Sequence, residues 1–121
     1  MKQLLFVFFG GGLGSIARYF LAKFYNSPVT GIPYGTLMAN VLGSLFIGLI
    51  LGWVARTNTL SENHTLLLAT GFCGGFTTFS TFAYENHLLL KSGDFFTFFL
   101  YTLVTFILGF LAVFLGMYLV R

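Results

Sequence analysis

The stretch Gly71-Phe72-Cys73-Gly74-Gly75-Phe76-Thr77-Thr78-Phe79-Ser80-Thr81-Phe82 lies in the middle of an apolar run over residues 66–90. That run is longer than the hydrocarbon core of a bilayer requires. Paired glycines, followed by alternating hydroxyl and phenyl side chains, lower the helix propensity at its centre. Backbone groups freed at membrane depth must be met by protein or by a water-filled cavity. We therefore expect two half-helices separated by a break at mid-membrane.

A break of this kind has two interpretations. Glycine eases close contact between helices, and serine or threonine can satisfy a freed carbonyl, so one interpretation is a packing kink. The hydroxyl and phenyl groups alternate over residues 77–82, which is more polarity and more aromatic surface than a kink needs. Broken helices at mid-membrane are also a recurrent way to build an ion site. The pattern favours an ion site.

The composition is that of a membrane protein. Of 121 residues, 57% are hydrophobic and only 7% are charged, whereas soluble domains carry roughly 25% charged residues. We expect an all-α protein with a single membrane domain over residues 1–121, surrounded by lipid. Its four spans are about residues 4–24, 34–55, 66–90 and 95–120, each near the roughly 20 residues that cross a bilayer. Six basic residues are too few and too scattered to predict nucleic-acid binding.

The first span contains a glycine cluster that is easily misread. Residues 12–17 (GLGSIA) fit a loose dinucleotide-binding fingerprint. No Asp or Glu precedes Glu62, so the carboxylate that would bind the ribose is absent. Gly10, Gly14 and Arg18 recur every four residues, which predicts one helix face with close backbone packing. Arg18 is either a snorkelling anchor or the positive end of an anion path.

Small and polar side chains also recur every four residues along two later spans. In the second span they are Thr36, Asn40, Ser44, Gly48 and Gly52, and in the fourth they are Tyr101, Thr105 and Gly109. We expect the first of these ridges to face protein and not lipid. The Asn40 amide suits either an interhelical hydrogen bond or a stop on the route of an anion. Hydroxyl groups could line a shared pathway or simply bond to their own helix.

Ionisable side chains are scarce inside the spans. Glu85 is the only acidic residue within a span, and we expect it to pair with Arg18, since both lie in the same half of the membrane. His64 and His87 lie near span ends. No constellation of serine, cysteine or histidine with a base in reach can be drawn from these residues, so the sequence does not predict an enzyme.

The basic residues give the chain no preferred orientation. With four spans they divide three against three, with Lys2, Arg56 and Arg121 on one side and Arg18, Lys23 and Lys91 on the other. The positive-inside rule therefore has nothing to choose between. A chain without bias can insert both ways, and two opposite copies can pair about an axis in the membrane plane. The count predicts dual topology and an antiparallel homodimer.

Three motifs together resemble the Fluc (CrcB) fluoride channels. They are residues 11–19 (GGLGSIARY), residues 35–43 (GTLMANVLG) and residues 71–82. The resemblance extends over all four spans, and the third motif is highly specific. It implies a passive exporter of fluoride in the cytoplasmic (inner) membrane of a microbe. It also implies an antiparallel homodimer with two fluoride pores and a structural sodium ion at its centre.

The same resemblance implies roles for individual residues. An ion pathway would be formed by a cation, an amide, two ring edges and a track of hydroxyls, namely Arg18, Asn40, Phe79, Phe82, Ser80, Thr81, Tyr101 and Thr105. Glu85 would be the acid near the pore, with a role in gating or coupling. Gly74 and Thr77 would provide backbone carbonyl ligands for sodium. Gly109 departs from the pattern, because relatives often carry serine there.

The physical chemistry of these residues agrees with that resemblance. Phenyl rings have a positive edge that can meet a small anion, and amide or hydroxyl donors can replace its water without trapping it. The residues alone indicate an ion pathway, and the resemblance indicates fluoride. The alternative is a small dual-topology proton-coupled multidrug or ion antiporter of similar size. That class needs an embedded carboxylate in the first span, which contains Arg18 and no acid.

Overall fold

The computed structural model describes residues 1–26, 31–58 and 60–121, and in these residues it contains helices and no strand. The elements are α1 (Lys2–Tyr25), α2 (Tyr34–Thr57), α3 (Glu62–Thr65), the π-helix η1 (Leu66–Cys73), α4 (Gly74–Phe76), α5 (Phe79–Ser92) and α6 (Phe95–Leu119). Four stretches are long and apolar enough to cross a membrane: Lys2–Tyr25, Tyr34–Thr57, Glu62–Ser92 and Phe95–Leu119. The predicted all-helical class with four spans is confirmed.

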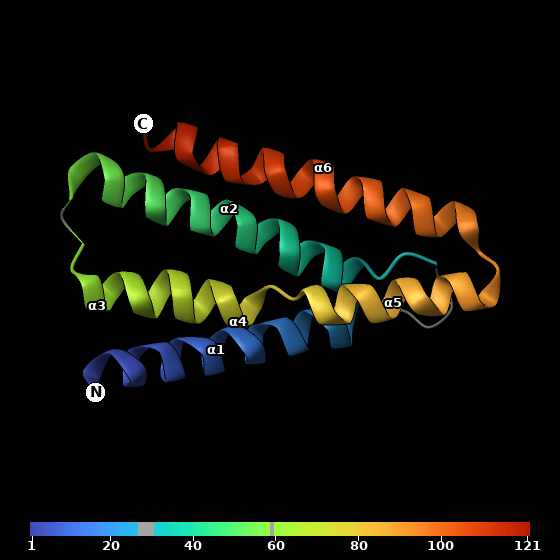
Figure 1. Cartoon of the computed structure of the whole chain (residues 1–121), viewed down its shortest axis with the longest axis horizontal. Coiled ribbons are helices and arrows are strands. Elements are labelled where there is room, and N and C mark those ends of the chain that lie inside the picture. Colours follow the sequence, from blue (N-terminus) through green and yellow to red (C-terminus); the bar gives the residue numbers. More distant parts are fainter. Residues whose placement is uncertain (27–30, 59) are drawn as a thin grey trace.

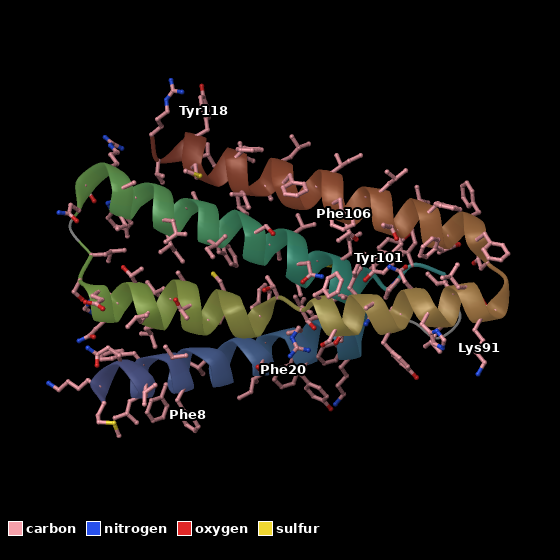
Figure 2. All side chains as sticks on the ribbon, viewed as in Figure 1. Phe8, Phe20, Lys91, Tyr101, Phe106 and Tyr118 are labelled. Atoms are coloured by element: carbon pink, nitrogen blue, oxygen red, sulfur yellow. The ribbon has the colours of Figure 1, made fainter. Side chains whose placement is uncertain are left out.

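The four stretches lie side by side and alternate in direction (Figure 1). α2 packs mainly against α6, and α1 packs mainly against η1 and α4. Large apolar side chains cover the outside of the bundle. Phe8 of α1 is 71% exposed and Tyr118 of α6 is 64% exposed, and both point away from the other helices (Figure 2). An apolar exterior of this kind suits a surface that faces lipid.

The contact between α1 and η1 is a contact of backbone against backbone. Gly10 and Gly14 are both buried. A Cβ atom at Gly10 would overlap the carbonyl oxygen of Leu67, and one at Gly14 would overlap that of Phe72. The close packing predicted from the spacing of four is therefore confirmed. Small residues permit this approach in membranes, where neighbouring helices gain little from hydrophobic burial.

The contact between α2 and α6 uses glycine in the same way. A Cβ atom at Gly48 would overlap the carbonyl oxygen of Val113, and one at Gly116 would approach that of Leu45. Thr36 is 2% exposed, and Gly48 and Gly52 are buried as well. The small and polar ridge of α2 thus faces protein, as its spacing predicts.

Helical backbone in the third stretch stops at Phe76 and resumes at Phe79. Thr77 (φ −90°, ψ 156°) and Thr78 (φ −153°, ψ 125°) are extended between them. The side chain of Thr78 then caps α5, because its Oγ1 accepts a hydrogen bond from the backbone N–H of Thr81 at 3.2 Å. The π-helical turns of η1 before this interruption were not predicted from the sequence.

Candidate functional site

Asn40 of α2 supplies the hydrogen bonds that the interrupted backbone lacks. Its Oδ1 accepts from the N–H of Thr78 at 2.7 Å, and its Nδ2 donates to the carbonyl of Thr78 at 3.1 Å. In a continuous α-helix the N–H of Thr78 would bond instead to the carbonyl of Gly74. The amide of Asn40 therefore acts as a piece of neighbouring backbone and holds Thr78 extended. This is the interhelical hydrogen bond that was one of the two interpretations of Asn40.

The carbonyl groups around the interruption divide into occupied and available ones. The oxygen of Gly75 accepts from Nε of Arg18 at 3.1 Å, and the oxygen of Cys73 accepts from Thr77. Within residues 1–26, 31–58 and 60–121, no hydrogen bond described outside the regular helices ends on the oxygen of Gly74 or Thr77. Gly74 is also exposed on the surface of the single chain. Both carbonyls could thus accept a ligand.

A groove of about 510 Å³ lies beside the interruption, between α2, α6 and the third stretch. Its walls are mostly small, hydroxyl and aromatic side chains: Asn40, Gly43, Ser44, Ile47, Ala69, Thr70, Cys73, Gly74, Thr77, Thr78, Phe79, Phe82, Thr105, Phe106, Gly109, Phe110 and Val113. None of these described lining residues is charged. Six of the predicted site residues meet here: Asn40, Gly74, Thr77, Phe79, Phe82 and Thr105. Arg18, Ser80, Thr81, Glu85 and Tyr101 do not line it.

Aromatic rings from α5 and α6 line part of the groove. Phe82 is 6% exposed, whereas Phe79 is 73% exposed in the single chain. The ring of Phe82 lies 5.9 Å from that of Phe79, 5.0 Å from that of Tyr101 and 6.1 Å from that of Phe106, the last at 85°. Such tilted and edge-on contacts place the positive edge of one ring against the negative face of the next. Phe82 therefore packs against three rings, whereas among the described ring contacts Phe79 packs against Phe82 alone.

The predicted hydroxyl groups are divided between two places. Near the interruption, Oγ1 of Thr78 lies 3.3 Å from the hydroxyl oxygens of both Ser80 and Thr81. On α6, Oγ1 of Thr105 is buried and has no hydrogen-bond partner among the described residues. A buried hydroxyl without a partner in this groove is open to a bound water or ion.

Glu85 is held by neutral donors and not by Arg18. Its Oε2 accepts from the hydroxyl of Thr36 at 2.7 Å, and its Oε1 accepts from the hydroxyl of Tyr101 at 2.7 Å. Tyr101 is fully buried and lies on the side of α6 that faces the bundle (Figure 2). The expected pair between Arg18 and Glu85 is wrong. Arg18 lies on the same face of α1 as the glycines, and its Nε donates instead to the carbonyl of Gly75 beside the interruption.

Asn26 completes this cluster and was missed by sequence reasoning. Its Nδ2 lies 3.2 Å from Oγ1 of Thr36 and 3.4 Å from Oε2 of Glu85, donating to both. Its Oδ1 accepts from the backbone N–H of Thr36 at 3.1 Å. Asn26 follows the last residue of α1 and lies outside the predicted spans. An amide directly after the end of a span was the available signal, because asparagine commonly satisfies backbone groups where a helix ends.

Comparison with known proteins identifies the family. The model of the family described as CrcB-like protein, Camphor Resistance (CrcB), matches residues 5–117. The chain belongs to the CrcB family. Among CrcB relatives, the fluoride-specific ion channel FluC of Gloeothece citriformis is 48% identical, covering 100% of this chain and 98% of its own length. The FluC proteins of Phocaeicola vulgatus and Leptospira interrogans are 44% and 41% identical.

The predicted family is therefore confirmed over nearly the whole chain. The FluC of Phocaeicola vulgatus covers 98% of this chain and that of Leptospira interrogans covers 99%. Together with the four apolar helices, this makes the CrcB-family chain a multi-pass membrane protein.

Proposed function

We propose that this chain is a passive, fluoride-selective ion channel that exports fluoride from the cytoplasm. The observation that carries the proposal is full-length similarity at 41–48% identity to proteins named fluoride-specific ion channels. The groove supports it, because donors and aromatic edges meet there among uncharged lining residues. Export from the cytoplasm requires residence in the cytoplasmic (inner) membrane of a microbe, which is part of the same proposal.

The groove can replace the hydrogen bonds that a small anion loses when it sheds its hydration water. Nδ2 of Asn40 uses one of its two hydrogens on Thr78, which leaves one to donate. Thr105 contributes a buried hydroxyl without a partner among the described residues. The ring edges of Phe79 and Phe82 add positive potential without a formal charge. Conduction needs binding that is favourable yet weak enough to release the ion, which neutral donors provide.

The other predicted residues act at the ends of this path. Ser80 and Thr81 extend the hydroxyl groups along α5 beyond the groove. Tyr101 ends the track on α6, with its hydroxyl donated to Glu85. Arg18, tied to the carbonyl of Gly75, brings positive charge near the interruption and attracts anions. Glu85, held by hydroxyl donors, has the gating or coupling role.

The functional unit in this proposal is an antiparallel homodimer with two pores. The even division of basic residues supports insertion in both orientations. Phe79 is 73% exposed and Gly74 is exposed beside the groove, so a second copy would cover both. Cysteine labelling from each side of the membrane tests this, and labelling of one orientation alone would contradict it. Two added lysines at one end are the control, since they should bias insertion.

A structural sodium ion at the dimer centre completes the proposed assembly. The oxygens of Gly74 and Thr77 fit it, because they are backbone carbonyls with no described hydrogen-bond donor outside the regular helices. Among the described residues, no three side chains of His, Cys, Asp and Glu come together to hold a metal. A hard monovalent cation bound by neutral oxygens suits that donor set. The ion would neutralise the facing carbonyl dipoles and link the two copies.

Efflux from liposomes tests the proposed function. Vesicles that contain the purified protein and potassium fluoride should release fluoride when a potassium ionophore provides a path for the balancing charge. Vesicles loaded with potassium chloride should release little chloride. The proton-coupled antiporter is the alternative, and α1 contains no acid to serve it. Fluoride release that needs a proton gradient and no ionophore would support the antiporter instead.

A further inference from the structure

Ser44 lies one helical turn after Asn40 on α2 and lines the same groove. Its side chain is half-buried. Its hydroxyl donates to the carbonyl of Asn40, with 2.8 Å between the oxygens. Bonds of this type from serine to its own helix are common and weak. The serine hydroxyl is therefore a donor that already lies in the groove.

Gly109 of α6 faces Ser44 across the groove. A Cβ atom built on Gly109 would have Oγ of Ser44 as its nearest neighbour, at 3.8 Å. One turn earlier on α6 lies Thr105, whose Oγ1 is buried and has no partner in the described part of the chain. Asn40 and Thr105 thus supply donors at one level of the groove. At the next level α6 offers only a glycine.

We propose that Ser44 is a further fluoride-contacting residue, which supplies from α2 the hydroxyl that Gly109 does not supply from α6. The inference rests on the proposed fluoride channel. Rotation of the Ser44 hydroxyl exchanges a neutral hydrogen bond for a charge-assisted one, which is roughly twice as strong. The carbonyl of Asn40 keeps the backbone N–H of Ser44, its regular α-helical partner. The exchange therefore leaves no backbone group unsatisfied.

The test moves the hydroxyl across the groove. Ser44→Ala should lower fluoride efflux from liposomes by about tenfold, the effect of losing one such contact. Adding Gly109→Ser to Ser44→Ala should restore efflux to within about threefold of the wild type, because the new side chain faces the vacated position. Gly109→Ala added to Ser44→Ala has the same backbone change without a hydroxyl, and it should restore nothing.

Ser92→Ala is the matched control. Ser92 makes the same kind of bond, from its hydroxyl to the carbonyl of Leu89 at 2.9 Å, and it does not line the groove. This variant should conduct like the wild type. All variants are compared at equal amounts of folded protein, measured by gel filtration in detergent.

The efflux measurements separate the role of Ser44 from the proposed channel function. Efflux of Ser44→Ala within twofold of the wild type, or equal rescue by Gly109→Ser and Gly109→Ala, would overturn the role of Ser44 while the wild type still conducts. A wild type that releases no fluoride would overturn the proposed channel, and the role of Ser44 with it. Loss in Ser44→Ala with rescue by Gly109→Ser alone supports the inference.

Discussion

The contact of α1 with η1 and the groove beside α6 contain the same kinds of residues and differ in what lies opposite them. Gly14 of α1 faces a backbone carbonyl, so a Cβ atom there would overlap Phe72. A Cβ atom on Gly109 would meet only Oγ of Ser44 at 3.8 Å, and one on Gly74 would meet nothing within 4 Å. Glycine at a spacing of four therefore indicates a helix face in contact with protein. Whether that face packs tightly or lines a groove depends on which atoms of the neighbouring helix lie opposite it.

The contact between α1 and η1 should be the most sensitive to added side-chain volume. Gly14→Leu places a side chain where the carbonyl of Phe72 lies, and backbone on both sides leaves no room to move. We expect loss of folded protein in gel filtration. Gly12→Leu is the control on the same helix, because a Cβ atom at Gly12 has no neighbour within 4 Å. If both variants fold equally well, the tight packing of α1 is wrong.

Asn40→Ala should impair both stability and conduction, because Asn40 belongs to the interruption and to the groove. The change leaves the N–H and carbonyl of Thr78 without their partners. Each unsatisfied group costs about 1–3 kcal/mol. Thermal unfolding in detergent and fluoride efflux should both show the loss. A variant as stable as the wild type would show that water replaces the amide, and normal efflux would remove Asn40 from the pathway.

Phe79→Ala and Phe82→Ala should separate conduction from packing. Phe82 is 6% exposed, so its truncation should cost roughly 3 kcal/mol of stability as well as lowering efflux. Phe79 is 73% exposed in the single chain, so its truncation should lower efflux with less effect on the fold. Efflux near that of the wild type in a folded Phe79→Ala variant would contradict the ring-edge role of Phe79.

Removing sodium should affect the fold of the single chain less than the association of the two copies. The carbonyls of Gly74 and Thr77 accept no described hydrogen bond outside the regular helices. The packing of α1 on η1 and of α2 on α6 does not depend on them. In buffer free of sodium and potassium the dimer should weaken or flux should stop, with selectivity for fluoride over chloride unchanged. Flux and dimer stability that are unchanged in such buffer would exclude the structural ion.

The sequence was sufficient for features that depend on one helix face. The spacing of Gly10, Gly14 and Arg18 predicted a single face, and in the structure the two glycines pack on η1 while Arg18 reaches Gly75. Hydrophobicity and length predicted the four helices, because a bilayer imposes both. The family motif predicted the relatives that comparison then found.

The sequence was not sufficient for contacts between helices. Thr36, Glu85 and Tyr101 come from three different helices, and their meeting depends on how those helices are aligned along the bundle. Arg18 and Glu85 looked paired because both lie in the same half of the membrane, but distance along the membrane normal says nothing about the direction of a side chain. The role of Asn40 at Thr78 required both the interruption and its neighbour to be in place.

The reversal potential of the current through a bilayer that contains the protein tests the central claim most directly. With a tenfold gradient of fluoride and equal pH on both sides, a passive fluoride-selective channel predicts reversal near 59 mV in magnitude, with the sign set by fluoride, since about 59 mV corresponds to a tenfold ratio for one charge. Imposing a pH gradient should leave that potential unchanged. A potential that moves with the pH gradient, or that follows a chloride gradient, would contradict the account.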